Sequence, residues 1–148
     1  MMNAVPLFLD ELTGLPHQAY FLDRLSEAAD AAQTGPQALA LLLVDLDNLF
    51  LINMERGRDS GDRALVALAV TLQRSARPGD TVARLGGDQF ALLLPGTSLA
   101  IATQFACGIR SLVGRAHDVH PDIGTIDVCI GVAACPERGR WRDRKSVV

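Results

Sequence analysis

Two stretches of the sequence place acidic side chains where they could do chemistry. Asp45 directly follows the apolar run 39–44, and Asp88 lies in the segment RLGGDQF at 84–90. An unbroken apolar run of this length is typical of a buried strand, and the two glycines before Asp88 are typical of a tight hairpin. If one sheet brings both carboxylates to the same edge, they could hold Mg²⁺ against nucleotide phosphates, as phosphoryl transfer requires.

Both aspartates also have an ordinary structural explanation. Aspartate is common where a helix starts and in hairpin turns, so Asp45 could begin the next helix and Asp88 could stabilise the turn. Residue type and spacing alone leave the metal site and the structural roles equally open.

The composition limits the classes of protein that fit. The chain has 148 residues, of which 49% are hydrophobic and 21% charged, which is typical of one globular domain. We expect a single domain over 1–135 and a basic, disordered or unrelated tail over 136–148. The net charge of −3 argues against a nucleic acid polymer as ligand. The apolar runs are too short to cross a bilayer, and no basic segment leads into an apolar one at the N-terminus. We therefore expect a cytoplasmic protein without a membrane partner.

The hydrophobic periodicity predicts an alternation of helices and strands. The expected helices lie at 17–33, at about 48–55, from about 62 onward, and from 98 to about 115. Residues 57–62 are expected to form the loop before the third helix, and Ser98 is the expected N-cap of the fourth. The expected strands lie at 39–44, 81–85, 90–94 and 125–133. This order predicts an α/β sandwich with helices packed on a mixed, mainly antiparallel sheet.

Several motifs, in order, resemble the GGDEF domain of diguanylate cyclases, which make cyclic di-GMP from two GTP molecules. They are DELTGL at 10–15, DLD at 45–47 with Ile52-Asn53, Gly57 followed by Gly61-Asp62, and ARLGGDQF at 83–90. The resemblance covers residues 10 to about 133. It implies an α+β fold of the nucleotidyl cyclase, palm-like kind.

The resemblance also implies a metal site. Asp45 and Asp88 would bind Mg²⁺, with the Leu46 carbonyl oxygen as a further ligand.

It further implies a nucleotide site. Asn53 and Asp62 would bind the guanine base, because a carboxylate can accept hydrogen bonds from the N1 and N2 edge of guanine and an amide can pair with the rest. Gly86 and Gly87 would let the nucleotide approach the backbone closely.

The sequence departs from the family at positions that matter for catalysis. Gln89 stands where the family carries a glutamate linked to catalysis, and Phe50 stands where it carries a lysine. The lysine and arginine that grip phosphates in the family's C-terminal part are not recognisable. An amide cannot take a proton, and loss of a general base commonly costs a factor of about 10² to 10⁴. No intact catalytic residue is therefore predicted.

Arg77 and Asp80 form an R-x-x-D pair that resembles the inhibitory product-binding site of the family. Arginine can bond bidentately to guanine O6 and N7 or to phosphate, and aspartate can accept from the Watson–Crick edge of guanine. The alternative is a polar turn with a surface ion pair.

These observations favour a degenerate GGDEF domain that binds cyclic di-GMP as a receptor or regulatory module and signals to an unknown protein partner. One alternative is a weak diguanylate cyclase that works on GTP as a homodimer. Another is a protein-interaction scaffold that binds no nucleotide.

Overall fold

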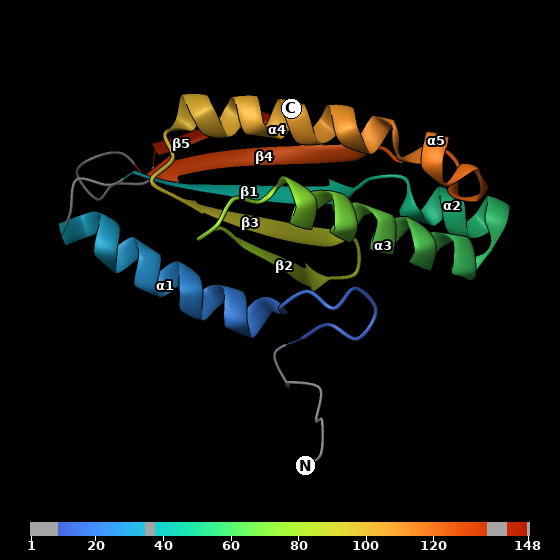
Figure 1. The fold of residues 1–148 in the computed structure, drawn as a ribbon, viewed down its shortest axis with the longest axis horizontal. Coiled ribbons are helices and arrows are strands. Elements are labelled where there is room, and N and C mark those ends of the chain that lie inside the picture. The colour runs from blue at the N-terminus through green and yellow to red at the C-terminus, as the bar shows by residue number, and fades with distance from the viewer. Residues whose placement is uncertain (1–8, 35–37, 136–141, 148) are drawn as a thin grey trace, which may run out of the picture.

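The structure is a computed structural model that describes residues 9–34, 38–135 and 142–147. Helices and strands alternate along the chain (Figure 1). In order, the elements are α1 (Gln18–Thr34), β1 (Leu39–Leu46), α2 (Leu49–Arg56), α3 (Arg58–Ser75), β2 (Thr81–Gly86), β3 (Gln89–Pro95), α4 (Leu99–Gly114), the short α5 (Ala116–Val119), a 3-10 turn η1 (Pro121–Ile123), β4 (Val128–Cys135) and β5 (Arg142–Val147).

The five strands form one sheet in the order β2-β3-β1-β4-β5. Each of the described pairings is antiparallel. The central strand β1 pairs along its length with β3 on one side and β4 on the other. The expected class, helices packed on a mainly antiparallel sheet, is confirmed.

Helices cover the two faces of the sheet unequally (Figure 1). On one face, α3 and α4 bury the main core, to which β1 contributes Ala40, Leu42, Val44 and Leu46. These positions alternate along the strand, because successive side chains of a strand point to opposite faces. On the other face, α1 packs Phe21 and Ala32 over a smaller cluster with β2 and β3. Because α1 lies mainly along β2, Leu43 in the sheet centre stays 46% exposed.

The segment 57–62 is not the loop that the sequence predicts. Only Gly57 separates α2 from α3, and its φ of +91° lies where glycine is favoured. The helix α3 begins at Arg58, and Ser60 and Gly61 are already buried in its first turns. Serine, aspartate and glycine in this stretch are typical of loops, but tertiary packing against α2 overrides that preference.

The C-terminal segment also differs from the sequence-based expectation. We expected a basic, disordered or unrelated tail over 136–148, but Arg142–Val147 forms β5 and pairs with β4. Residues 136–141 and 148 lie outside the described residues. Charged residues are common on edge strands, which explains why the basic composition gave no strand signal.

Within the described ranges, no helix combines the length and the apolar character needed to cross a membrane.

Candidate functional site

The fold brings Asp45 and Asp88 to one edge of the sheet. Asp45 is the penultimate residue of β1 and lies opposite Gln89 of β3. The Leu46 N–H donates to the Asp88 carbonyl oxygen at 3.0 Å. Asp88 therefore sits at the tip of the β2–β3 hairpin, directly beside the end of β1, and the two carboxylates expected to meet are neighbours.

The electrostatics of this edge are those of crowded negative charge. Burial, together with the nearby charges of Asp88 and Asp47, raises the pKa of Asp45 above its ordinary value. A hydrogen bond from the Gln89 side chain acts in the opposite direction and only partly offsets this effect. A cation would relieve the repulsion between the carboxylates.

The donor set fits Mg²⁺ held together with a nucleotide rather than a closed protein site. No cluster of three or more metal-binding His, Cys, Asp or Glu side chains occurs in the described part of the chain. Mg²⁺ is usually held by one or two carboxylates, with phosphates and water completing its octahedron. Asp45 and Asp88, with the Leu46 carbonyl, would supply the protein ligands, and the ion would neutralise phosphate charge.

Asn53 and Asp62 come from two consecutive helices, α2 and α3. Asn53 Oδ1 is buried and has no hydrogen-bond partner among the described residues. Gly61 makes its position possible, because a Cβ built at 61 would lie 1.7 Å from Asn53 Oδ1. A buried polar atom without a partner costs free energy, so such atoms are rare outside binding sites. Sequence reasoning placed Gly61 in a motif but missed that it makes room for Asn53.

The hairpin backbone at Gly86 and Gly87 requires glycine. Their φ values are +148° and +54°, and no other group lies within 4 Å of a Cβ built at either position. The side of the backbone where a Cβ would lie is therefore not covered by other groups at these two positions.

Arg84 connects this hairpin to the loop before α1. Its guanidinium donates to the Gly87 carbonyl at 2.7 and 3.1 Å and to the Asp10 carboxylate at 3.1 and 3.2 Å. Burial would raise the pKa of Asp10, but hydrogen bonds from Thr13 and pairing with Arg84 hold it below its ordinary value. Sequence reasoning missed this pair, although both residues lie inside quoted motifs.

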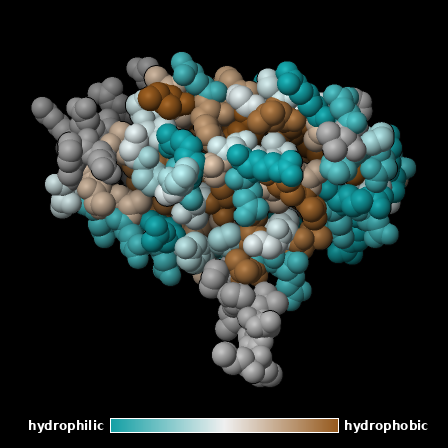
Figure 2. Space-filling view, in the orientation of Figure 1, coloured by the Kyte–Doolittle hydropathy of each residue, from teal (hydrophilic) through white to brown (hydrophobic). Residues whose placement is uncertain are grey.

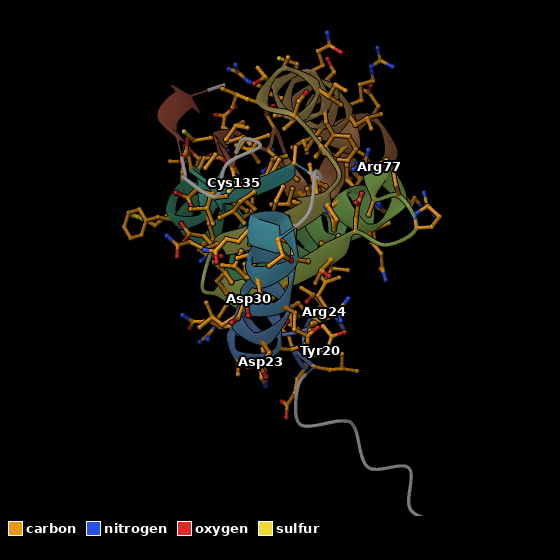
Figure 3. The ribbon with its side chains drawn as sticks, turned by 90° about the vertical axis from the view of Figure 1, so that its left-hand side faces the viewer. Tyr20, Asp23, Arg24, Asp30, Arg77 and Cys135 are labelled. Carbon is orange, nitrogen blue, oxygen red and sulfur yellow. The ribbon has the colours of Figure 1, made fainter. Side chains whose placement is uncertain are left out.

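Arg77 and Asp80 form a closed unit in the turn between α3 and β2. The Asp80 carboxylate accepts from the Arg77 main-chain N–H at 2.8 Å, from Nε at 3.1 Å and from Nη2 at 3.2 Å. Arg77 Nη2 also donates to Thr97 Oγ1 at 2.5 Å. The Asp80 side chain is only 2% exposed, whereas that of Arg77 is 44% exposed. Sequence reasoning found the pair but not Thr97. Figure 3 shows Arg77 well away from Tyr20 and Arg24 of α1.

The family model described as "Diguanylate cyclase, GGDEF domain" matches residues 7–144. Among curated proteins, the diguanylate cyclase TpbB of Pseudomonas aeruginosa is 40% identical over 131 residues, which are 86% of this chain and 30% of that protein. The diguanylate cyclase DgcM of Escherichia coli is 40% identical over 124 residues, which are 84% of this chain and 30% of that protein. The chain thus spans less than a third of the length of these relatives.

Solved structures agree with these matches. The GGDEF domain of DgcB from Caulobacter crescentus, in complex with c-di-GMP, superposes with a TM-score of 0.83 at 26% identity, covering 93% of this chain and 82% of that one. Diguanylate cyclase SiaD of Pseudomonas aeruginosa, in complex with its activator SiaC, gives a TM-score of 0.76 at 32% identity, covering 87% and 50%. Because the family model matches most of this chain, the chain belongs to the GGDEF family of diguanylate cyclase domains.

Proposed function

We propose that this domain binds cyclic di-GMP as a receptor or regulatory module and has little or no cyclase activity. The observation that carries the proposal is Gln89. Its amide lies at the sheet edge that carries Asp45 and Asp88 and hydrogen-bonds to Asp45, in the position where the family has its glutamate. An amide neither takes a proton from a ribose hydroxyl nor adds negative charge for a metal ion.

The Arg77–Asp80 turn is the proposed ligand site. In the structure, the Arg77 guanidinium donates to both carboxylate oxygens of Asp80, so each side chain already holds the other in a fixed orientation. Binding would exchange this contact for contacts with the ligand: Arg77 turns out to guanine O6 and N7 or to a phosphate, and Asp80 accepts from the guanine edge. The c-di-GMP complex of the DgcB domain supports the choice of ligand class.

The sheet edge at Asp45 and Asp88, together with Asn53 and Asp62 of the two helices that follow, is the second proposed contact region. Asn53, with its unpaired Oδ1, and Asp62 would bind a guanine, and Mg²⁺ on Asp45 and Asp88 would hold the phosphate. The Leu46 carbonyl would add a ligand to the ion.

A weak diguanylate cyclase acting as a homodimer on GTP is the competing function. It is favoured by the intact pair Asp45 and Asp88 and by cyclases at 40% identity. Incubation with GTP and Mg²⁺, followed by chromatography for cyclic di-GMP, separates the two functions. Robust turnover would defeat the proposal of a receptor.

Calorimetric titration with cyclic di-GMP tests the receptor directly. Arg77→Ala should weaken binding by about 10- to 100-fold, because a hydrogen bond to a charged group contributes about 1.5–3 kcal/mol. Arg24→Ala is the matched control: Arg24 pairs with Glu27 at the same i,i+3 spacing, at 3.0 Å on the exposed surface of α1. Equal binding by all three proteins would place the ligand elsewhere, and flat heats for all three would favour a scaffold that binds no nucleotide.

A further inference from the structure

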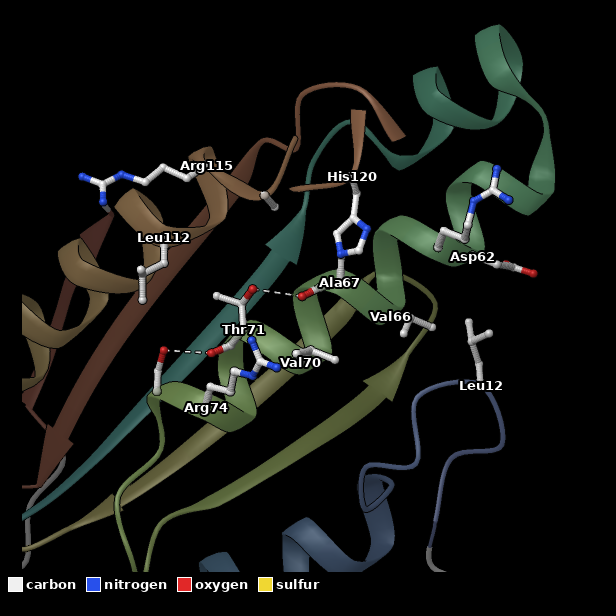
Figure 4. Close-up of a pocket in the computed structure, with 13 residues that line it drawn as sticks. Leu12, Asp62, Val66, Ala67, Val70, Thr71, Arg74, Leu112, Arg115 and His120 are labelled. Carbon is white, nitrogen blue, oxygen red and sulfur yellow. Dashed lines mark hydrogen bonds between the residues drawn. The ribbon is translucent and has the colours of Figure 1, made fainter. Parts of the chain in front are cut away.

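A cavity of about 700 Å³ opens along the outer side of α3 and is bordered by the end of α4 (Figure 4). Its apolar floor is formed by Leu12, Val66, Ala67, Val70, Leu112 and Ala116. We call this surface the α3 groove.

The floor of the α3 groove leaves large apolar side chains in water. Leu12 is 37% exposed, Val70 40% and Leu112 49%. The hydroxyls of Thr71 and Ser75 add little polarity, since they donate to carbonyl oxygens of α3 at 2.9 and 2.8 Å. Figure 2 shows apolar surface between hydrophilic side chains on the face that carries α3 and α4. A continuous exposed apolar surface rimmed by polar groups is typical of a site that binds a partner.

The groove is lined by more basic than acidic side chains, with Arg63, Arg74 and Arg115 against Asp62 at one end, on a protein whose net charge is −3. Arg63 is neutralised by Asp122 at 2.8 Å. Arg74 on α3 and Arg115 after α4 also line the groove, and their side chains have no ion pair or hydrogen bond to the rest of the described chain. Figure 4 shows these two arginines on the two sides of the groove. An occupant with acidic groups beside an apolar face would complement this arrangement.

We propose that the α3 groove binds an acidic amphipathic helix of a partner protein. The lining residues follow α3 from Asp62 to Ser75, a length of about 20 Å at 1.5 Å per residue, or nearly four helical turns. Apolar residues at i, i+3 or i+4 and i+7 of such a helix would contact Val70 and Leu112, as helices in grooves do. Its flanking carboxylates would reach Arg74 and Arg115. Of the residues proposed to contact nucleotide, Asp62 lines one end of the groove, whereas Arg77, Asn53 and the Asp45 edge do not. The proposed helix contacts at Val70, Arg74, Leu112 and Arg115 therefore go beyond the nucleotide function.

The first test uses two synthetic, side-chain-stapled helices of about four turns with the same leucine face. One carries glutamates along both flanks, and its twin carries lysines at those positions. Fluorescence anisotropy should show saturable binding of the acidic helix and at least about tenfold weaker binding of the basic twin. Equal binding of the two helices, or no saturable binding of the acidic one, overturns the proposal.

Variants then place the binding on the groove. Arg74→Glu and Arg115→Glu should each weaken the acidic helix by about tenfold, and Val70→Asp should remove its binding. Arg110→Glu is the matched control, because Arg110 is exposed on α4 and does not line the groove. Circular dichroism and thermal melting confirm that each variant is folded. A loss with Arg110→Glu equal to that with Arg115→Glu would overturn the proposal.

Two further measurements test the other occupants. If Val70→Asp converted a dimer into a monomer in sedimentation, the occupant would be a second copy of this chain, and the proposal would fail. It would fail as well if dodecanoate bound with the same dependence on Arg74 and Arg115 while the acidic helix did not. Neither experiment requires cyclic di-GMP, so failure here leaves the nucleotide function untouched, and the reverse also holds.

Discussion

The turn that holds Arg77 and the sheet edge that holds Asp45 treat their charged groups in opposite ways. In the turn, the Asp80 carboxylate accepts one hydrogen bond from the main-chain N–H of Arg77 and two from its guanidinium, and Thr97 Oγ1 accepts a further one from the guanidinium. At the edge, Asp45 faces the like charge of Asp88, and burial and that charge raise its pKa. Between α2 and α3, Asn53 Oδ1 has no partner within the described residues.

The contrast separates two kinds of binding site. At the edge, a cation would relieve the repulsion between the carboxylates and would compete only with the hydrogen bond from Gln89 among the described contacts of the Asp45 side chain. At Asn53, a ligand would pair an atom that has no partner within the described residues. At the turn, a ligand must replace contacts that the protein already makes with itself. Ligand binding at the edge should therefore stabilise the folded protein. The charged groups of the turn have hydrogen-bond partners whether or not a ligand is bound. A site of the second kind is suited to reporting a changing ligand concentration.

The largest effect is expected from Gln89→Glu. This change places a carboxylate that can take a proton at the edge. The rate of cyclic di-GMP formation from GTP in the presence of Mg²⁺ should therefore rise by about 10²-fold, the lower limit of the usual contribution of a general base. The lower limit is expected because Phe50 still replaces the family's lysine. Chromatography of the product measures the effect, with Gln104→Glu on the exposed surface of α4 as the control. If both variants stay at the parent level, Gln89 is not what limits the edge.

Gly61→Ala should disturb the position of Asn53 without changing any charge. The added Cβ would overlap Asn53 Oδ1, so the Asn53 side chain must move, and we expect a loss of about 1–3 kcal/mol in the free energy of unfolding. In Gly108→Ala, the control, the new Cβ meets nothing within 4 Å, so better helix propensity should stabilise α4 by up to about 1 kcal/mol. Urea unfolding compares the two. Similar values for both would mean that Gly61 does not hold Asn53 in place.

Asp45→Asn tests whether the edge is stabilised by a metal ion. Mg²⁺ at ten times its dissociation constant should stabilise the parent by about 1.4 kcal/mol and the variant hardly at all. Asp23→Asn, an exposed position on α1, should respond like the parent. Thermal melting with and without Mg²⁺ is the measurement, and an equal response of parent and Asp45→Asn would remove Asp45 from the ion.

The same variant should change the pH dependence in the absence of metal. Because the pKa of Asp45 is raised in the folded state, the folded protein holds this proton more tightly than the unfolded chain. The stability of the parent therefore falls as the pH rises from 3.8, the ordinary value, through the higher folded pKa. Asp45→Asn should lack this fall and melt at a higher temperature than the parent at neutral pH.

Sequence patterns predicted what depends on local alternation and on short motifs. The apolar run before Asp45 predicted a buried strand, and it forms β1 at the sheet centre. The glycine pair before Asp88 predicted the hairpin between β2 and β3. The sequence did not predict the strand order, so the meeting of Asp45 and Asp88 at one edge was a possibility that only the order β2-β3-β1-β4-β5 decides.

The features that the sequence did not reveal depend on contacts distant along the chain. Thr97 joins Arg77 across 20 residues, and Arg84 joins Asp10 across 74. The start of α3 was missed because Gly61 is unfavourable in a helix on its own, and only the packing of Asn53 explains it. The strand β5 was missed because its charged composition gives no apolar alternation, and backbone pairing with β4 forms it.

The smallest effect on ligand binding is expected from Thr97→Val, which tests whether the turn is held closed. Valine keeps the shape of this buried residue but removes the acceptor of Arg77 and the donor to the Pro95 carbonyl. These two hydrogen bonds contribute about 0.5–1.5 kcal/mol each, so the free energy of unfolding should fall by about 1–3 kcal/mol. Cyclic di-GMP should bind about threefold more tightly, since Arg77 has one contact fewer to break. Thr103→Val, which loses only a bond to the Leu99 carbonyl, is the control for calorimetry. Weaker binding by Thr97→Val would instead mean that Thr97 holds Arg77 ready for the ligand, and the contrast between the two regions would then be one of charge alone.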